Sequence, residues 1–331
     1  MSCAINNQRG IPVKELGKQL YLNLKCKPFT LILGNSRVDM TVLPRALAKK
    51  HGATAENGRY LQLQVRPDWM DSSDLIGWLN LEGTFIPGAV VDFFKAAHND
   101  PAHNYFLCLD KIILSRAEYY LRDLLTAVEL RGEKECKPYV PKAYFGRDEE
   151  AFQKYGVIPP LKNLFMVGTV NLDETSLPLN QRFLDRVHTM SVAEPVEDIQ
   201  IPEGDLSTLY YGLEQWEDAA VLDSYFAEFE KVNKILMQAT SYLGFKIRNE
   251  GILYLLHNRA TGLLPEKTAM DHVLCQKVLP RIQGGTKAVG SMLADFLTYC
   301  RENGYEETAR KAEKMRLSCE ENGYCSCWET E

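Results

Sequence analysis

Short apolar runs alternate with helical patterns through the first half of this sequence. Apolar runs at 29–33, 61–65 and 105–109 are preceded and separated by segments of helical spacing, of which 12–26, before the first run, and 41–51, after it, are the clearest. A strand, a helix and another strand in succession place the two strands parallel, because the helix crosses over the sheet between them. This alternation predicts an α/β core built on a parallel sheet.

The second half of the sequence changes character. Residues 194–205 carry two prolines and several acids, which is typical of a linker, and the strand signal largely disappears from residue 206 onward. We therefore expect two domains, a core at 1–195 and an all-helical lid and C-terminal lobe at 206–331. The helices of this lobe are predicted at 206–240, 246–261, 268–283, 287–302 and 305–317.

Four further segments complete the predicted core. The apolar run that begins at 164 indicates another strand, and 191–196 is expected to be an edge strand. The pattern at 115–130 indicates one long helix. The polar segment 131–162 is rich in Lys, Glu and Pro, so we expect a hairpin or a mobile loop there.

Charge and hydropathy argue against some classes of function. The chain of 331 residues has a net charge of −6, whereas surfaces that bind nucleic acid over a broad area are usually basic. It contains no run of about 20 apolar residues, so we expect neither a membrane-spanning helix nor a membrane partner. Met1 to Gly10 is polar and lacks the apolar centre of a signal peptide. A cytoplasmic location is expected.

The cysteines favour reduced thiols over disulfides or zinc ligands. Nine cysteines are scattered through a sequence without an export signal. Near the C-terminus, Cys319, Cys325 and Cys327 have the spacing C-x5-C-x-C, which matches no common zinc site. No metal site is expected beyond a possible Mg²⁺ at the loop described next.

The segment after the first apolar run has the position and length of a phosphate-binding loop. Gly34 to Thr41 lies between a predicted strand and a predicted helix. Such a loop uses glycines so that backbone N–H groups point at phosphates, a Lys to neutralise them and a hydroxyl for Mg²⁺. Gly34, Ser36 and Thr41 suit these roles. Met40 carries no charge, however, and Asp39 adds a negative charge where a polyanion would bind.

Several motifs of more than one residue follow one another along the chain. They are Lys27-Pro28-Phe29, the loop from Gly34 to Thr41, Val65-Arg66-Pro67-Asp68-Trp69, Leu184-Asp185-Arg186 and Gln276-Lys277-Val278-Leu279-Pro280-Arg281. Their order resembles the McrB-like branch of AAA+ proteins, the GTP-dependent motors of modified-cytosine restriction systems. The resemblance extends from about residue 20 to residue 328. It implies an AAA+ P-loop core with a parallel sheet, followed by a helical lid.

The resemblance also implies roles for the residues of the loop and of the next strand end. In the family the loop reads G-x-S-G-T-G-K-T, so Arg37 and Asp39 stand in place of glycines and Met40 in place of the lysine. Asp110 matches the acid associated with the metal. Lys111 stands where the family has its catalytic acid, and a lysine cannot act as the base that activates water there.

Three later positions match residues that act on the nucleotide in the family. Asn171, at the end of the strand that begins at 164, matches the sensor asparagine, and the acidic run 173–175 follows it. Arg186 matches the arginine finger, which acts on the nucleotide of an adjacent subunit. Lys246 stands in place of the arginine of the second sensor.

The cofactor implied by the resemblance is GTP or ATP with Mg²⁺, the metal lying at Thr41 and Asp110. Because both the lysine and the catalytic acid are replaced, we expect nucleotide hydrolysis to be absent or slow. Asp39 and Lys111 lie on adjacent loops. Either they pair with each other and fill the vacated site, or both are solvated loop charges.

Three functions remain open at this point. The first is a degenerate AAA+ subunit, a pseudo-NTPase that serves as a structural or regulatory partner in a restriction or phage-defence assembly. Such a subunit would join a homo- or hetero-oligomeric ring, with a nuclease as a possible further partner. The second is a slow GTPase or ATPase motor, and the third is a stand-alone binding module. We find no DNA-recognition module and no clear nuclease signature in the sequence.

Overall fold

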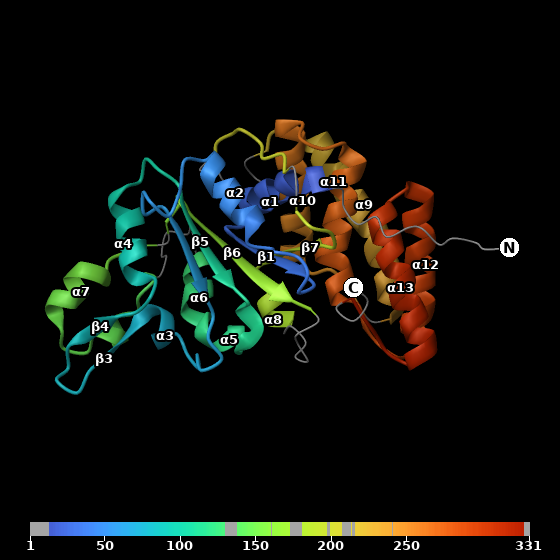
Figure 1. Cartoon of the computed structure of the whole chain (residues 1–331). Coiled ribbons are helices and arrows are strands. Elements are labelled where there is room, and N and C mark those ends of the chain that lie inside the picture. Colours follow the sequence, from blue (N-terminus) through green and yellow to red (C-terminus); the bar gives the residue numbers. More distant parts are fainter. Residues whose placement is uncertain are drawn as a thin grey trace.

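The computed structural model contains a central sheet flanked by helices and a separate stack of helices at one side (Figure 1). The predicted α/β core with a parallel sheet, followed by a helical lobe, is confirmed. The structure describes residues 13–129, 138–159, 161–172, 181–196, 199–206, 213, 216–239 and 241–327.

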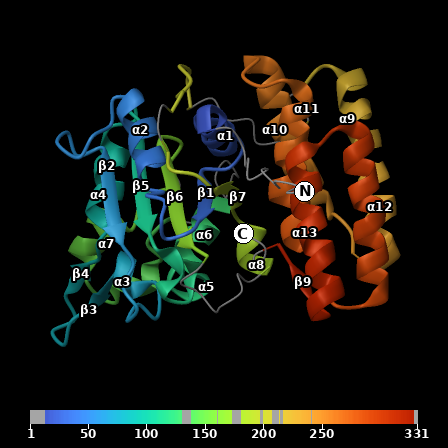
Figure 2. The same ribbon diagram turned by 45° about the vertical axis from the view of Figure 1, so that its right-hand side comes forward.

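The main sheet has five strands in the order β2-β5-β6-β1-β7, and every neighbouring pair is parallel. All residues of β1 and β6 are buried, as expected of strands covered on both faces. Figure 2 shows the sheet from β2 at one edge to β7, beside the helical lobe, at the other. The strands are β1 (Phe29–Gly34), β2 (Tyr60–Gln64), β5 (Tyr105–Asp110), β6 (Leu164–Asn171) and β7 (His188–Val192).

Helices cover both faces of this sheet. Side chains of successive strand residues point to opposite faces, so Ile32 belongs to one hydrophobic cluster and Leu31 and Leu33 to the other. The first cluster contains α1 (Val13–Cys26) and α2 (Val42–Lys50). The second contains residues of α3 (Ser73–Ile76), α4 (Val91–Asn99), α5 (Ala117–Tyr120) and α6 (Arg122–Glu129).

Three parts of the core differ from the prediction. The expected single helix at 115–130 is two helices, α5 and α6, which meet at Leu121. Part of the expected hairpin or mobile loop at 131–162 is helical, with η2 (Lys142–Phe145) and α7 (Glu149–Tyr155). A small antiparallel hairpin, β3 (Gly77–Leu79) and β4 (Phe85–Pro87), was not predicted, because strands of three residues show no readable alternation.

The helical lobe follows β7, the expected edge strand, which starts three residues and ends four residues earlier than predicted. Glycines in the left-handed conformation, Gly262, Gly304 and Gly323, follow α10, α12 and α13, where a side chain would be strained. The lobe comprises α9 (Ala219–Leu236), η4 (Met237–Ala239), α10 (Phe245–Thr261), α11 (Glu266–Val273), η5 (Leu274–Val278), η6 (Leu279–Arg281), β8 (Gln283–Gly284), α12 (Lys287–Asn303), α13 (Glu306–Asn322) and β9 (Cys325–Ser326).

Core and lobe share one hydrophobic cluster. Leu20 and Leu24 of α1 belong to the same buried cluster as Ile252 and Leu256 of α10, and the two helices pack directly on each other. Helix α1 therefore lies between the sheet and the lobe. None of the described helices has both the length and the apolar character needed to cross a membrane.

Candidate functional site

The carboxyl ends of three adjacent strands bring the predicted loop, acid and sensor positions to one edge of the sheet. Gly34 ends β1, Asp110 ends β5 and Asn171 ends β6. Gly34 pairs directly with Asn171, and β5 lies on the other side of β6. This edge is where α/β sheets with crossover helices place their ligands.

The loop after β1 supplies hydrogen-bond acceptors for its own backbone. The side chain of Asn35 accepts from the N–H of Arg37 at 3.1 Å, and its carbonyl accepts from the N–H of Val38 at 3.1 Å. Further along the loop, the side chain of Asp39 likewise accepts from the N–H of the residue two positions later, Thr41, at 3.0 Å. Three N–H groups in the segment that should face phosphate are therefore bonded within the segment itself.

Asp39 also holds the hydroxyl of the loop. Its Oδ1 accepts from Thr41 Oγ1 at 2.7 Å. Arg45, one helical turn further on, donates from Nη2 to the same hydroxyl at 2.8 Å and lies 3.9 Å from Asp39 Oδ2. Both charged side chains are more than half exposed, so their ion pair contributes little to stability. Its effect is local, because it places a guanidinium beside the hydroxyl predicted to bind Mg²⁺.

Met40 is part of the hydrophobic core. Its side chain is 4% exposed and belongs to the cluster that contains Ile32 and Leu43. A Cβ at Gly34 would lie 3.0 Å from the sulfur of Met40 and 2.9 Å from the carbonyl oxygen of Val192. Glycine is therefore required at position 34 by the close approach of Met40 and β7, whatever the loop binds.

The end of β5 is bonded to β6. Thr169, which is fully buried, donates its hydroxyl to Asp110 Oδ1 at 2.5 Å and accepts from the N–H of Lys111 at 2.9 Å. Lys111 has a φ of 55°, and no other non-glycine residue in the described part of the chain has a positive φ. A lysine in this region of the backbone map is uncommon and strained. It begins the short helix η1 (Ile112–Leu114).

The predicted pairing of Asp39 with Lys111 stays a prediction. The contacts that the structure gives for the Asp39 carboxylate are with Thr41 and Arg45, on its own side of the site. Ser36 lies in the exposed turn of the same loop. The acidic run 173–175, expected after the sensor position, lies outside the described residues.

The remaining two predicted residues lie toward the lobe. Arg186 follows the short helix α8 (Gln181–Leu184) and is half-buried, with its N–H bonded to the carbonyl oxygen of Phe183. Lys246 is near the start of α10 and lines a cavity of about 410 Å³ together with Asp185 and Arg281. None of the residues that line this cavity belongs to the loop after β1.

Sequence reasoning did not find a group of buried charges between core and lobe. Glu250 of α10 forms ion pairs with two lysines. Lys27 Nζ lies 2.5 Å from its Oε1, and Lys277 Nζ lies 2.7 Å from its Oε2. Lys277 also donates to the carbonyl oxygen of Val187, and Lys27 to that of Asp185. We call Lys27, Glu250 and Lys277 the junction triad, because its members come from the start of β1, from α10 and from η5.

The junction triad carries an excess positive charge in a buried place. Burial by itself would raise the pKa of Glu250, but Lys277 and Lys27 hold that pKa well below its usual range. Burial lowers the pKa of Lys277 to about 7, although the carboxylate of Glu250 opposes this shift. Burial, with Lys277 nearby, also lowers the pKa of His188, which keeps this fully buried ring neutral.

A second ion pair lies beside the junction triad. Arg281 of η6 donates from Nη2 to Asp185 Oδ1 at 2.7 Å. It therefore connects the lobe to the segment that holds Arg186. These residues had a sequence signal, since Lys27, Asp185, Lys277 and Arg281 all belong to the motifs that carry the family resemblance. That signal did not reveal that the four residues meet.

Comparisons with known proteins give a family match over part of the chain. Residues 200–324 match a family described as a domain of unknown function, DUF8727. No match was found among curated protein sequences.

Three solved structures are similar at low identity. A putative ATPase from Cytophaga hutchinsonii is 15% identical, with a TM-score of 0.45, over 80% of this chain and 81% of that one. NtrX from Brucella abortus is 12% identical, with a TM-score of 0.31, over 92% of this chain and 64% of that one. PCH-2 from C. elegans is 13% identical, with a TM-score of 0.24, over 94% and 77%.

At these identities and TM-scores the likeness says nothing about ligands or activity. The fold follows from the chain's own topology. A strand in the middle of the sheet leads through a loop into a helix, the acid and sensor positions end the two strands beyond it, and a helical lobe follows the last strand. This is the arrangement of a P-loop NTPase core of the AAA+ type with its helical lobe.

Proposed function

We propose that this protein is a degenerate AAA+ subunit of the McrB-like type, which acts as a structural or regulatory partner in a restriction or phage-defence assembly. The observation that carries the proposal is the loop after β1, where Asn35 and Asp39 occupy backbone N–H groups that a phosphate would need. In effect, the carboxylate of Asp39 takes the position of a bound anion.

The other residues of the site do not fit Mg²⁺ and a nucleotide. Met40 packs in the core and offers no charge to a phosphate. The hydroxyl of Thr41 is engaged by Asp39 and Arg45, and Asp110 accepts from Thr169. Lys111 replaces the acid that would orient and activate water. Each loss alone would weaken catalysis, and together they favour a subunit that does not turn over nucleotide.

The position of Arg186 suits a partner role. Arg186 follows Asp185, which is tied to the lobe by Arg281 and to the start of β1 by Lys27. An arginine that acts on another subunit's nucleotide must be held in a fixed place, because its contribution depends on position. We propose that Arg186 acts in this way in a hetero-oligomeric ring with intact AAA+ subunits, a nuclease being a possible further component.

Thermal unfolding with nucleotide tests the first half of this proposal. The wild-type protein should show the same melting temperature with and without 1 mM GTP or ATP and Mg²⁺, at a concentration typical for such assays. A ligand at 100 times its dissociation constant would stabilise the fold by about 2.7 kcal/mol, which is easily measured. The triple variant Asp39→Gly, Met40→Lys, Lys111→Glu tests the role of these side chains, and a gain of nucleotide-dependent stability is expected there.

A different result would favour the slow motor. If the wild-type protein binds GTP or ATP and hydrolyses it, and Asn171→Ala or Arg186→Ala abolishes the turnover, the proposal is wrong. Light scattering adds a second check. A protein that stays monomeric at all concentrations, both alone and with an intact McrB-like subunit, would favour the stand-alone binding module.

Mixing with an intact McrB-like GTPase tests the second half. We expect the wild-type chain to change the GTPase rate of that subunit, and Arg186→Ala to lose the effect. Arg182 is a matched control, since it lies in the same segment and is exposed. If Arg182→Ala and Arg186→Ala behave alike, the finger role is excluded.

A further inference from the structure

Strand β2 forms an open edge of the main sheet. It pairs with β5 on one side only. Arg59 accepts from the N–H of Phe106, and Val65 donates to the carbonyl of Asp110. In a parallel ladder every second residue bonds to the same neighbour, so the backbone groups of Gln62 and Gln64 point away from β5. Within the part of the chain that the structure describes, no hydrogen bond occupies them.

This edge has none of the usual protection. Natural proteins cover an edge strand or guard it with a charge, a proline or a bulge, because free N–H and C=O groups attract another strand. The sequence of β2, Tyr-Leu-Gln-Leu-Gln, contains neither a charge nor a proline. At its start the edge is closed, since the N–H of Tyr60 bonds to the carbonyl of Thr54. The free positions therefore begin beyond Tyr60.

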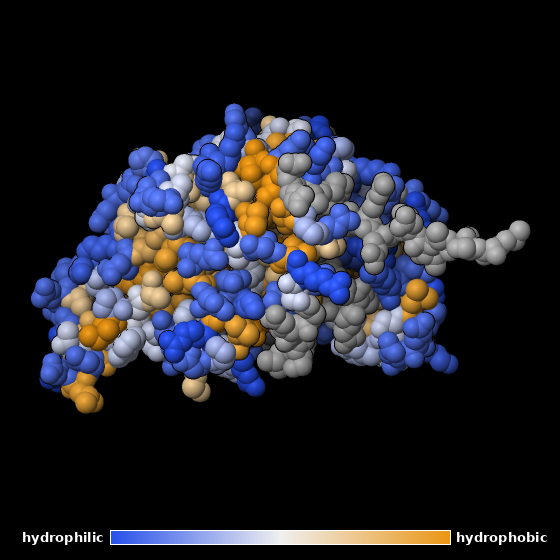
Figure 3. Space-filling view, viewed as in Figure 1, coloured by the Kyte–Doolittle hydropathy of each residue, from blue (hydrophilic) through white to orange (hydrophobic). Residues whose placement is uncertain are grey.

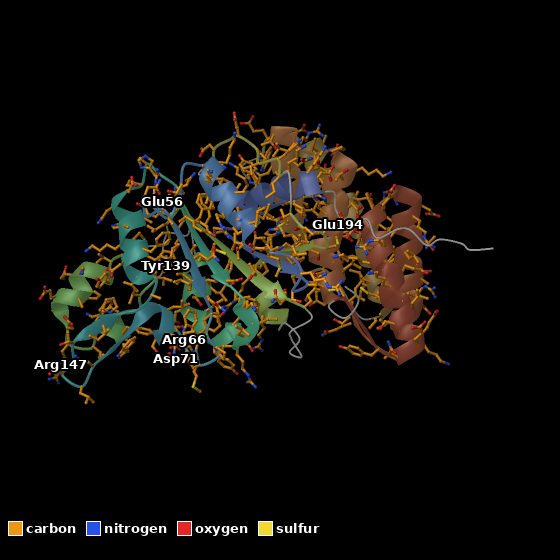
Figure 4. All side chains as sticks on the ribbon, in the orientation of Figure 1. Glu56, Arg66, Asp71, Tyr139, Arg147 and Glu194 are labelled. Carbon is orange, nitrogen blue, oxygen red and sulfur yellow. The ribbon has the colours of Figure 1, made fainter. Side chains whose placement is uncertain are left out.

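A groove accompanies the open edge. It has a volume of about 640 Å³ and runs from α2 and the turn after it, along β2, to α4. Leu61 and Phe93 give it an apolar floor. Figure 3 shows an apolar patch between α4 and β2, bordered by hydrophilic side chains. Figure 4 shows Glu56 near one end of β2 and Arg66 near the other, which marks the length of the edge.

The charge of the groove lies at its α2 end. Arg45 and Lys49 are one helical turn apart on α2, both are exposed, and both line the groove. Glu56 is the single acid among the lining residues. Arg66, at the far end of β2, is already bonded to Asp68. Arg45 is bonded to Thr41 and pairs with Asp39, so Lys49 is the main positive charge that the groove offers at this end, and its middle has an apolar floor.

We propose that this edge binds an extended segment of a partner protein by strand addition. The segment pairs with the free backbone groups of Gln62 and Gln64, places alternate apolar side chains on Leu61 and Phe93, and carries an acidic residue that meets Lys49. Backbone pairing supplies affinity, and the floor and the charges supply selectivity. The groove lies on the opposite edge of the sheet from β7 and the lobe, and Arg45 connects its α2 end to Thr41 and Asp39 of the loop after β1.

A library of linear 12-residue peptides displayed on phage, selected on the full-length protein, tests this proposal. Enriched sequences should alternate apolar and polar residues and carry Asp or Glu toward one end. Synthetic copies should bind Gln62→Pro at least about tenfold more weakly, because one ladder hydrogen bond is lost and the proline ring obstructs the strand. Gln62→Thr keeps the N–H and should bind as the wild type does.

The charge is tested in the same assay. Lys49→Glu should weaken the selected peptides, whereas Lys50→Glu should not, since Lys50 is the adjacent exposed lysine and pairs with Glu203 outside the groove. Circular dichroism and the melting temperature establish that each variant is folded. The proposal fails if no sequence is enriched, or if the selected peptides bind wild type, Gln62→Pro and Lys49→Glu equally well.

Discussion

The loop after β1 and the two lysines of the junction triad belong to motifs that carry the family resemblance, but their side chains are engaged differently. In the loop, Asp39 accepts a hydrogen bond from the N–H of Thr41, and Met40 packs in the core. At the junction the charged residues are present and fully engaged. The charges that join core and lobe are buried and paired, whereas the charged side chains of the loop are exposed.

The contrast also concerns burial. Asp39 and Arg45 are exposed, so water screens their charges and either can be exchanged at little cost. Lys277 and Glu250 are buried, and a buried charge without its partner is severely destabilising. The junction charges therefore resist substitution on stability grounds, whereas the charged side chains of the loop are less constrained.

The largest effect is expected at Glu250. Glu250→Gln removes the only carboxylate that the two lysines of the junction triad share, and we expect a loss of about 3–5 kcal/mol in the free energy of unfolding. Urea denaturation measures it. Glu203→Gln is the control, because Glu203 pairs with Lys50 at the surface and should change stability by less than about 1 kcal/mol. Equal effects at both positions would contradict the contrast.

Met40→Ala is expected to have the next largest effect. Removing a buried methionine side chain should cost about 2–3 kcal/mol, because the cluster around Ile32 loses contacts and a cavity remains. Such a result would mean that Met40 contributes to the stability of the core. Met70 is 80% exposed, so Met70→Ala should leave the denaturation midpoint unchanged. If Met40→Ala also leaves it unchanged, the loop is not packed as described.

Lys277 should make stability depend on pH. Its pKa is about 7 in the folded protein and has its ordinary value of 10.5 in the unfolded chain. Between these values the unfolded chain binds more protons, so stability rises with pH from about 7 upward, by at most about 1.4 kcal/mol per pH unit. Below pH 7 both states hold the proton and this dependence disappears.

The measurement is the difference between wild type and Lys277→Met in urea midpoints from pH 6 to pH 9.5, a range typical for such titrations. The difference should be constant at the acid end and should shift in favour of the wild type above neutral pH. A difference that does not change with pH would show that Lys277 keeps an ordinary pKa in the folded state.

The smallest effect is expected at Asp39. Asp39→Ala removes the acceptor for the N–H and hydroxyl of Thr41, which resembles the loss of a helix cap and should cost about 1 kcal/mol. Asp68→Ala is a control, because Asp68 is exposed to the same degree and bonds only to a surface arginine in the described structure. A loss at Asp39 as large as that at Glu250 would erase the distinction between the two regions.

Much of the fold could be predicted from the sequence, because it depends on local patterns. The buried strands are continuous apolar runs, and α10, α12 and α13 match the predicted helices closely. The prediction failed where local pattern is weak. The hairpin β3–β4 is too short to show alternation, and the polar composition around α7 concealed a helix.

The site was predicted by position but not by contact. Gly34, Asp110 and Asn171 meet because parallel strands end together, which the order of motifs already implied. The role of Arg45 could have been suspected, since a residue four positions after Thr41 lies above it on a helix. The junction triad could not, because Lys27, Glu250 and Lys277 come together only through the packing of α1 and α10.

The ion pairs of Glu250 bear on how the lobe is held against the core. The carboxylate of Glu250 pairs both with Lys27, just before β1, and with Lys277 of η5. These ion pairs lie where core and lobe share one hydrophobic cluster. Rotating the lobe away from the sheet would separate Glu250 from its lysine partners, and breaking a buried ion pair is costly. The junction therefore favours one fixed angle between the core and the lobe.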